Sequence, residues 1–277
     1  MSRGATRPLS RGGAALVGLV VAYLGLVLVV PLIALVQRAV AAGWTPLVEA
    51  LRSPAAVHGL AMSLALAAIA VVVNGVAGVA GALVLVRHRF AGRRALDALV
   101  ELPLAISPVA IGLAFLLVFG RNGWLEPALL AADVKVTFAF PGMVLATLFV
   151  TLPFTLREVA YVLEELGTAE EEAAATLGAS RAQIFWRVTL PNLRHALGYG
   201  VLLTAARALG EFGAVLVVGG DISESTRTAT TFIYASVEER NEAGAYGMAL
   251  VLAAVSALLL LGIEWTRKRR QKDVKQP

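Results

Sequence analysis

The sequence predicts an all-α, polytopic membrane protein with six transmembrane helices, and two observations carry that prediction. Of the 277 residues, 58% are hydrophobic and only 16% are charged, whereas soluble domains are about 45–50% apolar and about 25% charged. The apolar residues also come in long runs that match the roughly 17–25 residues needed to cross a bilayer. A soluble enzyme is nearly excluded, because one globule could not bury this much apolar surface. Cysteine is absent, which excludes disulfides, zinc–thiolate sites and cysteine nucleophiles.

The six runs follow one another along the chain and are almost free of charge. They are Ala14–Val36, Leu60–Val86, Leu102–Gly120, Val136–Leu156, Ala196–Gly219 and Ala243–Ile263. Prolines inside them, such as Pro103 and Pro153, are expected to kink or end the helices. The first run has 23 uncharged residues, more than the roughly 7–15 apolar residues of a signal peptide. An uncleaved anchor is therefore preferred over a signal peptide cleaved near Ala39–Ala41.

The distribution of lysine and arginine predicts the orientation, because cytoplasmic loops carry an excess of positive charge. With both termini in the cytoplasm, seventeen of the 24 basic residues lie inside, six lie outside, and Arg207 lies within a span. The inside residues are Arg3, Arg7, Arg11, Arg87, Arg89, Arg93, Arg94, Arg157, Arg181, Arg187, Arg194, Arg267, Lys268, Arg269, Arg270, Lys272 and Lys275. The formal net charge of +5 thus indicates topology and not a nucleic-acid partner.

The stretch between the fourth and fifth spans, residues 157–195, is too long for a simple connector and has its own helix signals. Thr168–Glu171 and Ser180–Gln183 have the pattern of capping boxes, in which two side chains satisfy backbone amides at a helix start. Gly178 is placed to end the first helix, and Pro191 to end the second. Two short helices with apolar stripes result. Such a hairpin suits insertion into a groove of a cytoplasmic partner, or else it lies on the bilayer surface or on its own bundle.

A fixed spacing in this hairpin resembles the EAA loop of bacterial ABC-importer permeases. Glu172-Ala173-Ala174 is followed by three residues, Gly178, nine residues and then Val188-Thr189-Leu190-Pro191. Only Val188 departs from the family pattern, which has isoleucine there. In that family the loop docks into a groove on the ATPase subunit, of which the complex holds two copies. The resemblance implies a coupling contact made by Glu172, Ala173, Ala174, Gly178, Leu190 and Pro191.

The chain itself lacks the usual route to ATP. A P-loop places lysine and then serine or threonine after a glycine-rich turn. The four lysines are Lys135, Lys268, Lys272 and Lys275, and none of them follows a glycine. We therefore expect this chain not to be an enzyme, and we expect a separate subunit to hydrolyse ATP. We also expect no cofactor and no metal site.

The fifth run contains Arg207 and Glu211, whose spacing places them about one turn apart on a helix. Charges at membrane depth are costly, usually paired, and often mark a transport path. Two interpretations stay open. One is a structural ion pair; the other is a path in which Arg207 favours anions while Gly210 and Gly213 allow close backbone approach.

Residues 206–214 resemble the fifth-span signature of permeases for tetrahedral oxyanions, the sulfate/thiosulfate and molybdate/tungstate group. Three further stretches resemble the W-type subunits of sulfate permeases: Glu101–Val109, Phe140–Glu158 and Gly167–Ala174. The resemblance implies the type I importer permease fold, a homologous T-type permease as partner, a periplasmic sulfate-binding protein and transport by alternating access. The chain departs from the family pattern at residues 219–225 and 234–241. In one interpretation, residues 219–225 face the binding protein.

The resemblance covers about residues 60–265 and divides the chain into three parts. Residues 1–59 would form a cytoplasmic tail, the first span and a periplasmic loop; 60–265 the permease domain; and 266–277 a basic tail against lipid headgroups. The expected location is the bacterial inner membrane. A molybdate/tungstate permease working as a homodimer is the alternative within the class. An ion-driven secondary transporter is the alternative outside it, and that would favour more ionisable groups at membrane depth.

Overall fold

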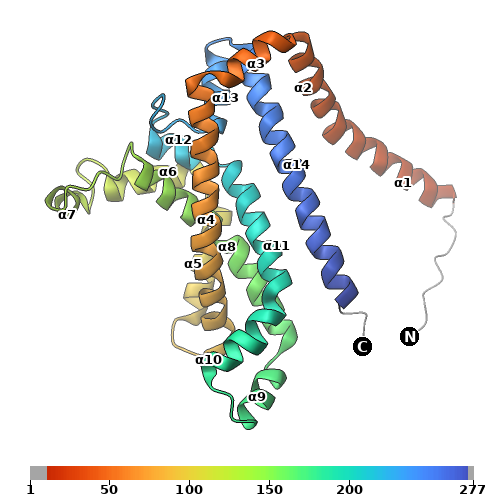
Figure 1. Cartoon of the computed structure of the whole chain (residues 1–277), viewed down its shortest axis with the longest axis vertical. Coiled ribbons are helices and arrows are strands. Elements are labelled where there is room, and N and C mark those ends of the chain that lie inside the picture. The colour runs from red at the N-terminus through yellow and green to blue at the C-terminus, as the bar shows by residue number, and fades with distance from the viewer. Residues whose placement is uncertain (1–10, 274–277) are drawn as a thin grey trace.

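The structure, a computed structural model, describes residues 11–273, and within them every regular element is a helix (Figure 1). The α-helices are α1 Arg11–Leu24, α2 Val30–Ala41, α3 Trp44–Arg52, α4 Pro54–Arg87, α5 Arg93–Ala105, α6 Pro108–Phe119, α7 Glu126–Ala131, α8 Phe140–Leu166, α9 Ala169–Thr176, α10 Arg181–Ile184, α11 Leu190–Leu209, α12 Gly213–Gly219, α13 Ala229–Glu238 and α14 Glu242–Asp273. Two π-helical segments, η1 Gly25–Val29 and η2 Phe185–Thr189, each join two of them. The predicted all-α class is confirmed. The last four residues of the expected basic tail lie outside the described residues.

The centre of the molecule is the packing of α4 and α11 against α8 (Figure 1). On α8, Thr147, Thr151 and Thr155 recur every fourth residue and are all buried, so they share one face of the helix. Asn74 Nδ2 of α4 donates to Thr151 Oγ1 at 2.8 Å. The hydroxyl oxygens of Thr155 and Thr204 lie 2.9 Å apart, which links α8 to α11. Side-chain hydrogen bonds therefore join the three helices inside an apolar environment.

Glycine lets both neighbours approach α8 closely. A Cβ atom at Gly78 of α4 would lie 3.0 Å from the backbone nitrogen of Leu156, and one at Gly200 of α11 would lie 2.9 Å from Thr155 Cα. Small residues at such positions bring helix backbones into direct van der Waals contact.

Four helical segments are long and apolar enough to cross a membrane: Gly12–Ala41, Pro54–Arg87, Phe140–Leu166 and Glu242–Gly262. The other two expected spans are not single helices. Leu102–Gly120 is divided between α5 and α6, which are bent by 115°. Ala196–Gly219 is divided between α11 and α12, where the bend is 55°. If each bent pair forms one span, the described residues hold up to six.

Proline chemistry explains the sharper bend. Pro108 disfavours helical backbone in the residue before it, and Ile106 and Ser107 are extended, with ψ values of 140° and 135°. Helix α5 therefore ends at Ala105. Pro108 then starts α6, where its missing N–H would have no intrahelical partner anyway. Pro153, in contrast, lies inside α8, which continues through it.

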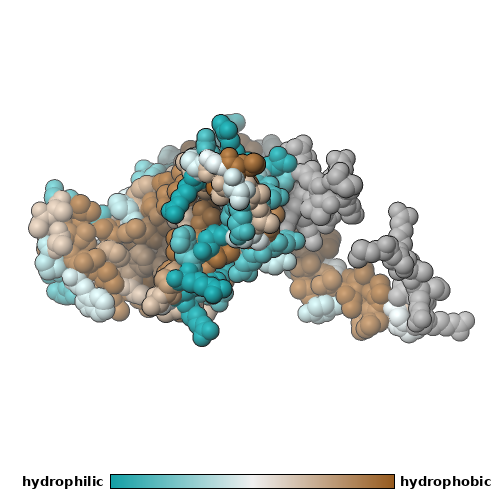
Figure 2. All heavy atoms as spheres, turned by 90° about the horizontal axis from the view of Figure 1, so that it is seen from below, coloured by the Kyte–Doolittle hydropathy of each residue, from teal (hydrophilic) through white to brown (hydrophobic). Residues whose placement is uncertain are grey.

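The first span and the hairpin both lie away from the central packing (Figure 1). None of the apolar window of Gly12–Ala41 is buried within the described chain. Helices α9 and α10 lie at the end of the bundle opposite α3 and α13 (Figure 1). Figure 2 views that end: hydrophilic residues gather in its middle and hydrophobic residues flank them. This distribution fits a polar end surrounded by bilayer-facing sides.

Candidate functional site

Arg87, the last residue of α4, holds the base of the hairpin, which we define as residues 168–191. Its Nη2 donates to the carbonyl of Gly167 at 2.6 Å and its Nη1 to the carbonyl of Leu163 at 3.3 Å. Both carbonyls lie at the C-terminal end of α8. Its Nε lies 3.1 Å from Glu171 Oε2 in an ion pair. One side chain therefore joins α4, α8 and α9.

The first turn of α9 is also tied to the start of α11. Glu171 Oε1 accepts a hydrogen bond from Thr189 Oγ1 at 2.8 Å. Glu170 Oε2 accepts one from Asn192 Nδ2 at 2.6 Å. Acidic side chains in the first turn of a helix are also favoured by the helix dipole. Two neighbouring glutamates thus fix α9 against the helix that returns to the membrane.

The prediction of a capping box at Thr168 is wrong. Thr168 precedes α9, but its side chain makes no capping hydrogen bond. The carboxylate of Glu171, expected to complete that box, is directed instead to Arg87 and Thr189. The physical reason is that Arg87 adds the attraction of an opposite charge, which the neutral Thr168 amide does not supply. The second box is confirmed, since Ser180 Oγ accepts from the Gln183 amide and Gln183 Oε1 accepts from the Ser180 amide.

Gly178 makes the turn between the two hairpin helices. Its φ is +85°, in the left-handed region that favours glycine. The Gly178 amide donates to the carbonyl of Ala175 at 3.0 Å, and the Ala179 amide to that of Ala174 at 3.1 Å, which is the Schellman pattern. A Cβ at Gly178 would meet nothing within 4 Å. The backbone conformation alone therefore calls for glycine here.

The other residues of the motif lie at the hairpin surface. Glu172, Ala173 and Pro191 are exposed, whereas Ala174 and Leu190 are half-buried. Two large apolar side chains of the hairpin, Leu177 and Trp186, are 89% and 65% exposed. Both side chains are therefore accessible to a partner at this end of the molecule.

Pro191 does not end the second hairpin helix, contrary to the prediction. Helices α10 and α11 continue into each other through η2, so that Arg181–Leu209 is one helical segment. The π-helical turns end two residues before Pro191, which lies in the first turn of α11. A proline ring clashes with the carbonyl four residues before it, and the wider π-helical register relieves that clash.

The Arg207–Glu211 pair lies at the break between α11 and α12. Arg207 Nη1 is 2.6 Å from Glu211 Oε2, although Glu211 lies beyond the end of α11. Glu211 Oε1 accepts from the Ala214 amide at 2.9 Å, so the carboxylate caps α12. Thr230 Oγ1 donates to the Glu211 carbonyl at 2.7 Å. The Glu211 side chain is 1% exposed and that of Arg207 is 30% exposed.

Of the two glycines expected at this position, one makes a close contact. A Cβ at Gly213 would lie 3.0 Å from Val109 Cγ2 and 3.2 Å from Pro108 Cβ, so Gly213 brings α12 close to α6. A Cβ at Gly210 would meet its nearest neighbour at 3.6 Å, which is ordinary contact.

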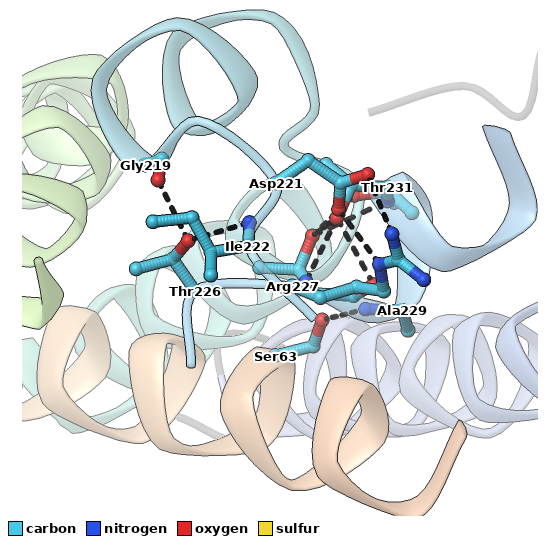
Figure 3. Close-up of polar contacts among 10 residues, drawn as sticks. Ser63, Gly219, Asp221, Ile222, Thr226, Arg227, Ala229 and Thr231 are labelled. Carbon is cyan, nitrogen blue, oxygen red and sulfur yellow. Dashed lines mark hydrogen bonds and ion pairs between the residues drawn. The ribbon is translucent and has the colours of Figure 1, made fainter. Parts of the chain in front are cut away.

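The loop after α12, where the sequence departs from the family pattern, is built by its own polar side chains (Figure 3). Arg227 Nε and Nη2 donate to the two carboxylate oxygens of Asp221 at 3.1 and 3.2 Å. Thr226 Oγ1 donates to the carbonyl of Gly219 at 2.6 Å and accepts from the Ile222 amide at 3.0 Å. Ser63 Oγ of α4 accepts from the amide of Ala229 at 2.9 Å, which anchors the loop to the bundle (Figure 3).

Sequence reasoning singled out residues 219–225 but missed the side-chain contacts that build this loop. The signal that could have found its end is Thr228, placed before a run of helix-compatible residues: its side chain caps α13 together with Thr231. Within residues 11–273, His, Asp and Glu side chains form no group of three that could hold a metal ion.

The family described as binding-protein-dependent transport system inner membrane component matches residues 74–272. The chain belongs to this family. It is 46% identical over 246 residues to the sulfate transport system permease protein CysW of Synechocystis sp., with 89% of each chain covered. It is 40% identical over 247 residues to the sulfate transport system permease protein CysT of Escherichia coli, again with 89% of each covered.

A solved structure has the same fold. It is the bacterial alginate ABC transporter in complex with its alginate pentasaccharide-bound periplasmic protein. The TM-score is 0.77, 94% of each chain is covered, and 18% of residues are identical. The chain therefore has the type I ABC-importer permease fold and is a multi-pass membrane protein.

Proposed function

We propose that this chain is the transmembrane permease subunit of an ATP-driven importer for sulfate and thiosulfate. It would move the anion from a periplasmic binding protein to the cytoplasm by alternating access. The observation that carries the proposal is the hairpin: its motif has the family spacing, its base is tied to three helices, and its tip exposes Glu172, Ala173 and Leu177. The substrate follows from relatives named as sulfate transport permeases at 46% and 40% identity.

The proposal also assigns the partners of this chain and its orientation in the membrane. Two copies of an ATPase subunit hydrolyse ATP, and one of them receives this hairpin. A homologous T-type permease is the second membrane subunit, and a periplasmic sulfate-binding protein delivers the anion. Both termini and the hairpin are cytoplasmic, because this orientation places seventeen basic residues inside and six outside. The loop 219–228, at the other end of the bundle, faces the binding protein.

The proposed coupling step is the one that the family resemblance implies, and the geometry of the hairpin supports it. ATP binding draws the two ATPase subunits together, and their grooves carry the hairpins with them. Glu172 supplies an exposed charge to the groove, and Ala173 and Leu177 supply apolar contact. Because α10 continues into α11 without a break, movement of the hairpin reaches the membrane directly.

Substitution of Gly178 tests the coupling assignment. Gly178→Val should lose co-purification of the ATPase subunit and ATP-driven uptake while the protein stays in the membrane, because a left-handed backbone costs an L-residue about 1–2 kcal/mol. Gly178→Asn is the matched control, since asparagine tolerates this conformation. Uptake at the wild-type rate in Gly178→Val would show that the coupling assignment is wrong.

The path assignment is that Arg207, Glu211, Gly210 and Gly213 lie along the route of the anion, with Arg207 as the attracting charge. A double variant separates this role from a structural one. Arg207→Met with Glu211→Gln removes both charges and keeps an acceptor for the Ala214 amide. If Arg207 attracts the anion, the double variant folds and assembles but takes up labelled sulfate poorly. Wild-type uptake would leave the pair a purely structural role.

The choice of anion and of partner has its own measurement. Uptake of labelled sulfate should be inhibited by excess thiosulfate more strongly than by molybdate. Affinity purification of the complex should yield two kinds of permease chain. A single kind of permease chain together with competition by molybdate would favour a molybdate importer instead.

A further inference from the structure

Arg87 and Glu171 lie outside the six motif residues, yet their side chains join four elements. Arg87 ends α4 and donates to two carbonyls at the end of α8. Glu171, in the first turn of α9, pairs with Arg87 and accepts from Thr189 of η2. Residues 87 and 171 are 84 positions apart in the chain, so this contact exists only because the helix ends meet there.

Helix α9 depends on these polar contacts for its place. None of its eight residues, all of which the structure describes, is buried. Apolar packing therefore does little to hold it on the bundle. The side chains of Arg87 and Glu171, in contrast, are only 15% and 23% exposed. An ion pair shielded to this degree is screened less by salt than one on the open surface.

The connections of the hairpin are therefore of two kinds. One is covalent, and it joins α9 to α8 through Gly167 and α10 to α11 through η2. The other is the ion pair, which runs from α9 to α4 and, through the Leu163 and Gly167 carbonyls, to α8. Without the ion pair, α9 would keep its covalent joint to α8 at Gly167 but would lose this tie to α4, so displacement of the hairpin would reach α4 less directly.

We propose that Arg87 and Glu171 are positioning residues that transmit displacement of the hairpin to α4 and hold the end of α4 against the end of α8. This rests on the proposed function of the hairpin as the ATPase contact. The pair would make the three central helices follow the hairpin together. It touches neither the anion nor ATP, so its loss should separate ATP hydrolysis from transport.

The first test measures uptake per ATP hydrolysed by the full complex in proteoliposomes. In Arg87→Gln and in Glu171→Gln the ATPase subunit should still co-purify and hydrolyse ATP, while sulfate uptake per ATP falls about tenfold, within the range known for residues that couple distant sites. Arg89→Gln and Glu164→Gln are matched controls, because both residues are exposed and lie outside the ion pair. Unchanged uptake per ATP in both test variants would overturn the proposal, as would a parallel loss of uptake and of co-purification.

A second measurement gives a signature that a merely structural pair would not produce. The chain contains no cysteine, so spin labels can be attached after Ala175→Cys on α9 and Val84→Cys on α4 with no background labelling from this subunit. The distance between the labels should stay constant on ATP binding in the otherwise wild-type complex and should change when Glu171→Gln is added. A distance that changes equally with and without Glu171→Gln would overturn the link. Failure of the wild-type chain to bind any ATPase subunit would instead overturn the proposed function.

Discussion

Two of the arginine–glutamate pairs of this permease, Arg87–Glu171 and Arg207–Glu211, follow one rule but differ in their surroundings. In each, the arginine lies in the last turn of a helix, α4 or α11, and the glutamate lies at the start of another, α9 or α12. Both placements are favoured by the helix dipoles, since the positive charge lies at a C-terminal end and the negative charge at an N-terminal end. Arg87 and Glu171, however, are 84 positions apart, whereas Arg207 and Glu211 are only four apart and bridge a break in one span.

Burial of the carboxylate separates the two pairs. Glu211 is 1% exposed, and the Glu171 side chain is 23% exposed. A charge left alone in a buried site is costly, whereas a partly solvated one recovers hydration from water. We therefore expect that breaking the pair at α12 lowers stability and that breaking the pair at the hairpin mainly lowers coupling.

The largest effect is expected for Glu211→Ala. This change leaves Arg207 without its partner and removes the acceptor for the Ala214 amide. An unsatisfied buried donor such as the Ala214 amide costs about 1–3 kcal/mol, and the lost attraction to Arg207 adds to this cost, so the melting temperature of the purified protein in nanodiscs should fall strongly. Glu211→Gln keeps an acceptor for the Ala214 amide, so the melting temperature of this variant should fall less. Equal melting temperatures for Glu211→Ala and the wild type would mean that this pair is no more structural than the one at the hairpin.

A smaller effect is expected where α12 meets α6. Gly213→Val would place side-chain atoms against Val109 and Pro108, whose atoms lie 3.0 and 3.2 Å from the Cβ position. Such overpacking costs about 1–3 kcal/mol and should lower the melting temperature. Gly210→Ala is the matched change on the same break, where the nearest atom is at 3.6 Å, and it should be tolerated. The opposite order would show that Gly210, and not Gly213, sets the position of α12.

The sequence predicts one of the two ion pairs and not the other, for physical reasons. Arg207 and Glu211 are visible because they are charges inside an apolar run, and their spacing is local. Arg87 and Glu171 are not visible as a pair, since nothing local relates two residues 84 positions apart. The local signal at Glu171 was a capping box, and the charged partner supplied by α4 outweighs it.

Prolines show the same limit of local reasoning. Pro108 ends a helix as its local chemistry implies, because it disfavours helical backbone at Ser107. Pro191 was expected to end a helix too, but Pro191 and Pro31 each follow a π-helical segment that lets the helix continue. A proline in the sequence therefore does not by itself tell whether the helix breaks, as at Pro108, or widens into a π-helix, as before Pro191.

The smallest expected effect comes from a neutral counterpart of the two ion pairs. The hydroxyl oxygens of Thr155 on α8 and Thr204 on α11 lie 2.9 Å apart, and both residues are buried. Valine has nearly the shape of threonine, so Thr155→Val and Thr204→Val remove the hydrogen bond and keep the packing. Hydrogen bonds between membrane helices average about 0.6 kcal/mol in double-mutant cycles, so the coupling energy from unfolding of the two single variants and the double variant should be of that size. A coupling energy as large as the loss in Glu211→Ala would mean that the stability of this bundle rests on polar contacts in general and not on the buried charge at α12.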